Sequence, residues 1–191
     1  MQYTNIHFIL STFFGLGKIS KKMPGTIGSV VAFPLTLYCF KLSKFFHKFF
    51  HFNNVIINAL AFPLLLILLL FIIGTISSAE YSRYCKNSDP KEVIIDEIVG
   101  QMLCITLTIP ISLLFYQAHF TNYPFDLWLI AVIFVNFILF RLFDILKPWP
   151  ISWVDKKCKG GFGIMLDDVL AAIFASIIYF LIFLNMLDYL K

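Results

Sequence analysis

Charged side chains are scarce in this sequence. They make up 14% of its 191 residues, against 60% for hydrophobic residues, whereas soluble domains average about 25% charged residues. A water-soluble protein of this length has too small a core to bury so much apolar surface. The shortage of charge therefore excludes an ordinary soluble domain and predicts an integral membrane protein.

Cysteine is also rare, and its placement excludes further classes. The four cysteines are widely spaced, so the chain has neither a CxxC metal motif nor an evident disulfide framework. The net charge of +4 comes from basic residues scattered beside apolar segments, not from the basic and aromatic stripe typical of nucleic-acid-binding surfaces. No positively charged stretch precedes the first short apolar segment, so we expect an amphipathic or partly embedded first helix rather than a cleaved signal peptide.

Long apolar runs are what the sequence has instead. A membrane-spanning helix needs roughly 20 apolar residues, and the chain offers four clear candidates and a fifth, shorter one. Pro63 and Pro110 fall within two of the runs, where neighbouring helices of a bundle can accommodate a proline. With no internal repeat or linker, we expect one all-α, membrane-embedded domain over residues 1–191. The candidate spans are residues 27–40 (the short one), 55–76, 98–116, 125–143 and 169–187.

Five crossings would gather most of the charge on one side of the membrane. That side holds eleven of the fifteen basic residues and nine of the eleven acidic ones. By the positive-inside rule it is the cytoplasmic side, so we expect acidic cytoplasmic loops. Residues 41–52 place three lysines on the opposite side; if 27–40 is a re-entrant or interfacial helix, leaving four spans, this segment returns to the inside. The sequence leaves that choice open.

A glycine-rich segment, GLGKISKKMPGTIGS at residues 15–29, leads into the first span. Backbone N–H groups at the start of a helix, helped by nearby lysines, can bind a phosphate. Gly-Lys-Ser/Thr does not occur, so this is not a Walker A loop, and a simple turn with a helix cap is an equally good interpretation. The candidate phosphate-binding residues here are Lys18, Lys21, Lys22, Gly25, Thr26 and Ser29.

Two acidic segments lie beside later spans. In DPKEVIIDEIVG, residues 89–100, a helix would place Glu92 and Asp96 on one face, where like charges repel unless a cation lies between them. In GGFGIMLDD, residues 160–168, adjacent aspartates follow a glycine-rich turn, which suits a divalent cation with oxygen ligands. A helix N-cap or the helix dipole explains one acidic residue in each segment but not several.

A third segment, FRLFDILKPWPI at residues 140–151, mixes both signs of charge. Arg141, Asp144 and Lys147 recur at intervals of three, so a helix ended by Pro148 would carry a basic, acidic, basic row. Snorkelling would explain the two cations but not the aspartate between them. Ionisable residues this close to a span are functional by default. Carboxylates for Mg²⁺ and cations for phosphate, at headgroup level, indicate phosphoryl chemistry on a lipid.

Four motifs in order, PGTIGS, VIIDEIVGQ, FRLFDILKPWPI and GGFGIMLDD, resemble the signature segments of the bacterial phosphatidylglycerophosphatase A family. The resemblance covers about residues 15–175. It implies a Mg²⁺-dependent enzyme of the bacterial inner membrane, facing the cytoplasm, that hydrolyses phosphatidylglycerophosphate to phosphatidylglycerol and phosphate. It also implies that five carboxylates bind the metal and carry the catalysis: Asp96, Glu97, Asp144, Asp167 and Asp168.

Roles for other residues follow from this reading. Arg141 and Lys147 are expected to hold the phosphate, and one carboxylate, not singled out, acts as the base. Glu80, Asp89 and Glu92 are secondary candidates. A covalent route is disfavoured because all four histidines fall outside the motifs and neither DxDxT nor Cys-x5-Arg occurs. The expected partners are the phospholipid substrate and the membrane, without nucleic acid, and a homo-oligomer is left open.

Three other functions stay open at this point. A CDP-alcohol phosphotransferase also uses membrane carboxylates and a divalent metal, but its spaced Asp-Gly-Ala-Arg pattern is missing here. A small ion transporter would place its carboxylates in mid-span, whereas these fall at span ends. A non-catalytic assembly subunit would tolerate the loss of all the aspartates.

Overall fold

Helices form all the regular structure in the residues that the computed structural model describes, which are 4–20, 22–46 and 55–189. Shorter helices are α1 (Thr4–Ser11), η1 (Leu16–Lys18), η2 (Tyr116–Phe120) and α6 (Ile151–Lys157). The predicted all-α membrane bundle is confirmed. In the described part of the chain five helices are long and apolar enough to cross a membrane: α2 (Pro24–Phe46), α3 (Val55–Cys85), α4 (Ile95–Phe115), α5 (Phe125–Leu146) and α7 (Gly161–Tyr189).

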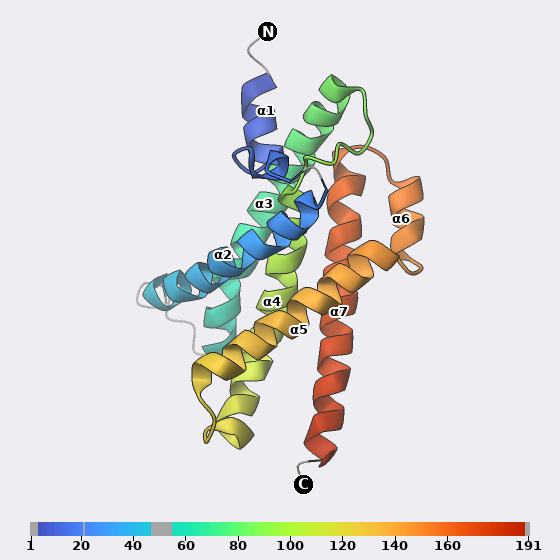
Figure 1. Ribbon diagram of the computed structural model, residues 1–191. Helices are drawn as coiled ribbons and strands as arrows, with labels where there is room; N and C mark the ends of the chain where they lie inside the picture. Colours follow the sequence, from blue (N-terminus) through green and yellow to red (C-terminus); the bar gives the residue numbers. More distant parts are fainter. Residues whose placement is uncertain (1–3, 21, 47–54, 190–191) are drawn as a thin grey trace.

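Helix α4 lies at the centre of the bundle (Figure 1). Over an 18-residue apolar stretch of each spanning helix, 67% of the α4 residues are buried, against 33% for α2 and 22% for α3, α5 and α7. Gly100 permits this packing, because a Cβ there would lie 2.7 Å from the Phe140 ring of α5 and 2.9 Å from the Asp168 carbonyl oxygen of α7. The position of every other spanning helix is therefore set against α4.

Polar side chains deep in the bundle pair across helices. The Asn136 amide oxygen of α5 accepts hydrogen bonds from Thr108 at 2.7 Å and from Cys104 at 3.3 Å, both on α4. Ser112 of α4 shares a 2.5 Å hydrogen bond with Tyr179 of α7. Hydrocarbon offers no water to satisfy such groups, so these contacts serve to fasten α4 to its neighbours.

The N-terminal segment supports the loop that leads into α4. Helix α1 packs against α3, and the Ser11 carbonyl oxygen accepts a hydrogen bond from the Ile94 N–H at 3.0 Å. Gly17 in η1 lies so close to the Glu92 carbonyl oxygen that a Cβ would collide with it. The segment expected to be an amphipathic or partly embedded helix thus fixes the start of α4.

All five spanning helices extend beyond the predicted spans. Helix α3 ends at Cys85 rather than 76, and α5 ends at Leu146 rather than 143. Helix α2 covers residues 24–46 rather than 27–40, α4 begins at Ile95 rather than 98, and α7 begins at Gly161 rather than 169. A hydropathy pattern ends where charges begin, but a helix continues where its charged side chains face a cavity instead of lipid. The five principal carboxylates therefore lie in helix ends and not in loops. Of the segment 41–52, residues 47–52 lie outside the described residues.

Gly161, the first residue of α7, gives a test of this packing. It touches the Thr75 carbonyl group of α3 so closely that a Cβ would collide with backbone. Replacing a helical glycine by alanine normally stabilises by about 1 kcal/mol, but we expect Gly161→Ala to destabilise the protein by roughly 1–3 kcal/mol because backbone must move. Thermal unfolding in detergent measures the change.

Gly74→Ala is the matched control at the same pair of helices. A Cβ at Gly74 would meet the flexible end of the Met165 side chain, 2.6 Å from its sulfur, and that side chain can shift. We expect a smaller loss of stability than for Gly161→Ala. Equal unfolding midpoints for the two variants would contradict the proposed contact.

Candidate active site

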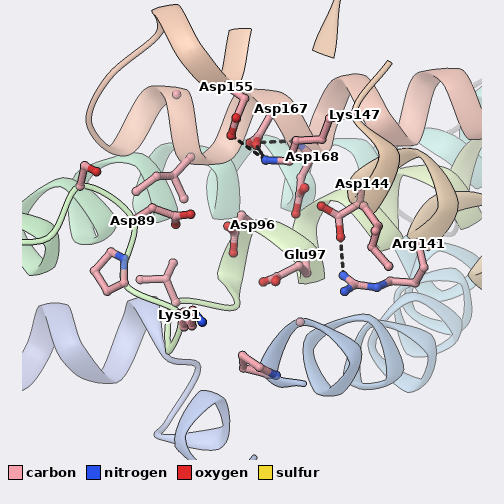
Figure 2. A pocket seen from close by; sticks show the side chains of 18 of the residues that line it. Asp89, Lys91, Asp96, Glu97, Arg141, Asp144, Lys147, Asp155, Asp167 and Asp168 are labelled. Carbon is pink, nitrogen blue, oxygen red and sulfur yellow. Dashed lines mark hydrogen bonds and ion pairs between the residues drawn. The ribbon is translucent and has the colours of Figure 1, made fainter. Parts of the chain in front are cut away.

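A cavity of about 440 Å³ lies among the helix ends at one end of the bundle. Its walls come from the starts of α2, α4 and α7, the end of α5, α6 and the loops before α4 and α7 (Figure 2). Side chains or backbone from all four sequence motifs line it. Segments that are far apart in the sequence thus meet at one face of the membrane domain.

Three carboxylates form the most crowded part of the cavity. Oxygen atoms of Asp96, Glu97 and Asp168 all lie within 4.8 Å of one another, and Figure 2 shows the Asp96 and Glu97 carboxylates turned toward each other. One oxygen of each residue (Asp96 Oδ1, Glu97 Oε2, Asp168 Oδ2) is buried with no hydrogen-bond partner among the described residues. We call these three residues the acidic cluster.

The acidic cluster needs a compensating charge. At an effective dielectric constant of about 20, two carboxylate charges within 4.8 Å repel by roughly 3 kcal/mol or more. Asp96 and Glu97 lie in the first turn of α4, where the helix dipole stabilises each carboxylate by at most about 2 kcal/mol. Unpartnered carboxylate oxygens from two helices match the hard oxygen donors that a divalent cation requires. The residues present therefore fit a bound Mg²⁺ ion.

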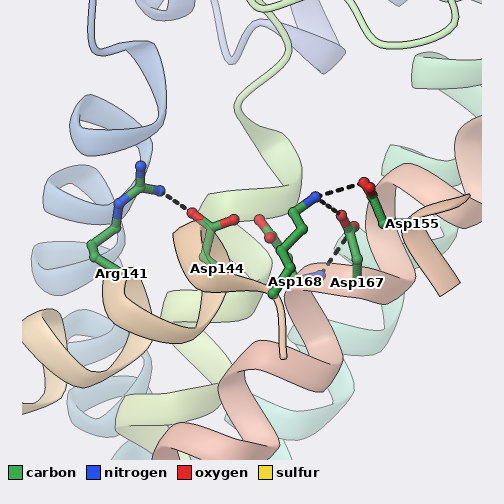
Figure 3. Close-up of polar contacts among 6 residues, drawn as sticks. Arg141, Asp144, Asp155, Asp167 and Asp168 are labelled. Atoms are coloured by element: carbon green, nitrogen blue, oxygen red, sulfur yellow. Dashed lines mark hydrogen bonds and ion pairs between the residues drawn. The ribbon is translucent and has the colours of Figure 1, made fainter. Parts of the chain in front are cut away.

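Arg141 supplies positive charge at the wall of the cavity. Its guanidinium donates to Asp144 at 2.5 Å, the i,i+3 contact expected from the spacing, and the two side chains are 18% and 13% exposed (Figure 3). Asp144 points toward Asp168 and so extends the acidic cluster at its edge. An arginine has five N–H donors, so this contact leaves others for a phosphate.

Lys147 does not continue the predicted row along α5. It caps the helix in a left-handed conformation, with φ 42°, and its ammonium group donates to Asp155 of α6 at 2.7 Å and to Asp167 of α7. Burial lowers the pKa of Lys147, but these hydrogen bonds outweigh it and raise the pKa above its usual value. The hydrogen bond from Lys147 also lowers the pKa of Asp155. Both groups are therefore charged at neutral pH and tie α5, α6 and α7 together.

The start of α2 closes over the acidic cluster. Gly25 faces the Glu97 carboxylate and the Arg141 guanidinium so closely that a Cβ would collide with Glu97 Oε1. Thr26 lines the cavity beside it. The backbone N–H groups in the first turn of a helix have no partners within the helix, so this end of α2 can present donors to an anion.

Two predicted phosphate-binding residues lie away from the cavity. Ser29 is fully buried, and its hydroxyl donates to the Gly25 carbonyl oxygen at 3.0 Å. The Lys18 ammonium lies over the Phe8 ring, 4.3 Å from its centre. Lys22 does line the cavity, and Lys21 lies outside the described residues.

Of the three secondary acidic candidates, only Asp89 lines the cavity. Glu80 pairs with Arg83 on the surface at 2.6 Å. Glu92 lies in the loop before α4 and not one turn from Asp96, because the helix begins only at Ile95. The prediction that Glu92 and Asp96 share one helix face is therefore wrong.

Sequence reasoning missed three charged residues that line the cavity, Asp155, Lys91 and Lys159. The segment ISWVDKK forms α6, a short helix that buries Ile151 and Val154, and this amphipathic pattern was the available signal for Asp155. No spacing rule connects Asp155 to Lys147, because the turn between their helices decides that contact.

Comparison with known proteins bears on what this cavity does. The sequence profile described as Phosphatidylglycerophosphatase A matches residues 9–183. The chain belongs to the phosphatidylglycerophosphatase A family. Membership confirms the resemblance carried by the four motifs, and with it the prediction of a membrane phosphatase of phospholipid metabolism.

Named relatives agree on phosphatase activity but not on the lipid. A Haemophilus influenzae phosphatidylglycerophosphatase A is 58% identical over 55 residues, which cover 29% of this chain and 31% of that protein. An Escherichia coli protein of the same name is 28% identical over 95% of this chain and 86% of its own. A Bacteroides thetaiotaomicron protein with the provisional name phosphatidylinositol-3-phosphatase is 31% identical over 89% of each chain. No solved structure matches the chain.

Asp168→Asn tests the acidic cluster as a cation site. The variant removes one of three crowded charges, so we expect it to be more stable than the wild type in EDTA. It should also lose most of the stabilisation that Mg²⁺ gives the wild type, which is about 2.7 kcal/mol at a hundred times the dissociation constant. Thermal unfolding in detergent, with EDTA or with Mg²⁺, measures both effects.

Glu80→Gln is the control for this substitution. It makes the same kind of change at an exposed ion pair outside the cavity, and it should follow the wild type in both conditions. An unchanged Mg²⁺ response in Asp168→Asn would exclude the acidic cluster as the cation site.

Proposed function

We propose that this protein is a Mg²⁺-dependent phosphatase that hydrolyses phosphatidylglycerophosphate to phosphatidylglycerol and phosphate. The observation that carries the proposal is the acidic cluster, with its unpartnered oxygens, beside Arg141 in one cavity. Carboxylates alone would fit many cation sites, and an arginine alone would fit many anion sites. Together, at the end of a membrane bundle, they fit a metal-assisted reaction on a lipid phosphate.

The acidic cluster would hold the metal, with Asp144 and Asp167 at its edges. When bound there, Mg²⁺ would neutralise charge on the phosphate oxygens and lower the barrier to attack by water. These residues come from α4, α5 and α7, whose mutual packing is fixed by Gly100 and its contacts. The donor set is thus held in place before substrate arrives.

Cations and amides of the cavity would hold the substrate phosphate. Arg141 can contact two phosphate oxygens with its planar fork, and the N–H groups at the start of α2 add neutral donors. Gly25 has no side chain in the space between Glu97 and Arg141. Lys147 is paired with Asp155 and Asp167, so it would hold the helix ends around the phosphate while Arg141 makes the direct contact.

Hydrolysis then needs a water molecule in line with the leaving oxygen. Its oxygen forms the new bond to phosphorus, the bond from phosphorus to the glycerol oxygen breaks, and the glycerol oxygen takes up a proton. A carboxylate of the cavity accepts the proton that the water loses. None of the described cavity-lining residues is a histidine, which favours this direct route over a phosphohistidine intermediate.

The membrane orientation belongs to the same proposal. Lys22, Lys91 and Lys159 line the cavity, and most basic residues of the chain fall at this end of the spanning helices. By the positive-inside rule this supports a cavity that opens at the cytoplasmic face, in a protein of the bacterial inner membrane.

A phosphatidylinositol 3-phosphate phosphatase is the second candidate, because the relative from Bacteroides carries that provisional name. Both lipids present a phosphomonoester next to a phosphodiester. An ion transporter is a weaker candidate, since the carboxylates lie in a cavity at one end of the bundle. The three lysines that line the cavity, Lys22, Lys91 and Lys159, favour an anionic headgroup without choosing between the two lipids.

Phosphate release from defined lipids tests the proposal. We expect the purified protein in detergent micelles to release phosphate from phosphatidylglycerophosphate with Mg²⁺, and EDTA to reduce the rate at least a hundredfold. Phosphatidylinositol 3-phosphate should be hydrolysed at least tenfold more slowly. Release from the inositol lipid alone would establish the second candidate, and release from neither would reject a phosphatase function.

Arg141→Lys tests the contact with phosphate. Lysine keeps the charge but loses the planar fork, so we expect the catalytic efficiency to fall roughly 10- to 100-fold, which corresponds to about 1.4–2.8 kcal/mol. Arg83→Lys is the matched control, because Arg83 also pairs with an acidic residue three positions away but outside the cavity. Equal activity of the two variants would contradict a phosphate-binding role for Arg141.

A further inference from the structure

Two of the described residues that line the cavity are large, apolar and exposed. Met23, just before α2, is 58% exposed, and Ile145, near the end of α5, is 70% exposed. Exposed apolar side chains are ordinary on a membrane protein, where lipid covers them. Met23 and Ile145 differ from the others because they also line the charged cavity. They therefore mark the boundary between the cavity and the outer surface of the bundle.

Met23 and Ile145 flank the point where α2 and α5 come together at the cavity. A Cβ on Gly25 would lie 2.9 Å from the guanidinium of Arg141, and Figure 2 shows Arg141 between the ribbons of these two helices. Met23 precedes Gly25 by two residues, and Ile145 follows Arg141 by one helical turn. We call the cavity rim between Met23 and Ile145 the lateral opening.

An apolar stripe on α5 leads to the lateral opening. Ile130, Phe134, Ile138 and Ile145 are between 47% and 70% exposed and recur at intervals that place them on one helix face. Arg141 falls on the same face between the last two, yet it is only 18% exposed. The stripe therefore runs along the lipid-facing side of the bundle and ends beside the guanidinium.

A second apolar stripe approaches the lateral opening on α2. Val30 and Leu37, seven residues apart, share a face of α2, and Met23 lies just before the helix begins. All three side chains are between 36% and 58% exposed. Below the cavity, Phe33 of α2 and Phe137 of α5 are in ring contact at 6.0 Å. That contact fills the space between α2 and α5 toward the middle of the membrane. The opening between the two helices therefore lies at their headgroup end.

We propose that the lipid substrate enters the cavity sideways through the lateral opening, with its acyl chains against the α2 and α5 stripes and its phosphomonoester against Arg141. The inference rests on the proposed function and adds the binding site for the diacylglycerol part of the substrate. A headgroup in the cavity and acyl chains in the bilayer must be connected across a rim. This rim has apolar side chains outside and the Arg141 guanidinium inside, as such a connection requires.

Two substrates that share a headgroup test the proposal. One is long-chain phosphatidylglycerophosphate in mixed micelles, and the other is its soluble deacylated headgroup. In the double variant Met23→Gln, Ile145→Gln we expect the KM for the long-chain lipid to rise roughly tenfold, the factor given by about 1.4 kcal/mol of lost apolar contact. The kcat for the lipid, and both constants for the soluble headgroup, should stay within twofold.

Ile76→Gln is the matched control. Ile76 is 56% exposed on α3 and does not line the cavity, so its variant should keep the wild-type KM for both substrates. Equal losses on the two substrates in the double variant would mean a distorted site, and unchanged kinetics would mean entry elsewhere. Either result would overturn the proposal of lateral entry. So would a smaller oligomer in the double variant than in the wild type, because it would show that a second copy of the chain covers the opening.

A photoactivatable group on the acyl chain of phosphatidylglycerophosphate separates this proposal from the proposed function. If the wild type releases no phosphate from either substrate, the function has failed, and labelling still tests the opening. Labelled peptides should contain residues 22–37 or 130–149. Labelling confined to the lipid-facing sides of α3 and α7 would overturn the proposal.

Discussion

Repulsion among buried carboxylates is the interaction on which the arrangement of this protein depends. Oxygen atoms of Asp96, Glu97 and Asp168 lie within 4.8 Å of one another, and the nearby cations Arg141 and Lys147 are already paired with other carboxylates. Like charges in a poorly solvated space are tolerated only when the surrounding structure holds them there. The tight packing around α4 supplies that support, since Gly100 brings α5 and α7 against it one turn beyond the carboxylates.

The two cations have different parts in this arrangement. Arg141 is paired within its own helix, so this ion pair involves α5 alone. Lys147 reaches out of α5 to Asp155 and Asp167, so its position depends on α6 and α7. The first cation is therefore suited to contact a substrate that comes and goes, and the second to hold three helices at a fixed separation around the site.

Features within a single helix could be predicted from the sequence, whereas contacts that depend on how a turn places the next helix could not. Composition and apolar runs predicted a membrane bundle of four or five spanning helices, and spacing placed Arg141 and Asp144 in one row, because one helix contains both residues. The partners of Lys147 follow from a left-handed residue at the end of α5 and from the placement of α6, which no periodicity encodes. Ser29 was expected to help bind a phosphate at the start of α2, but it is fully buried, and its hydroxyl donates to the Gly25 carbonyl oxygen within the helix. The roles of the five carboxylates remain predictions, which the geometry fits.

The place of the cavity follows from the cost of moving a lipid. Taking an acyl chain out of the bilayer costs about 0.8 kcal/mol per CH₂, or roughly 25 kcal/mol for two chains of about 16 carbons. No binding site of ordinary affinity could offset such a cost. An enzyme that acts on a phospholipid must therefore bring its charged groups to the headgroup plane and leave the chains in the membrane. Carboxylates and cations gathered at the ends of spanning helices, with Ile145 and Met23 at the rim, meet that requirement.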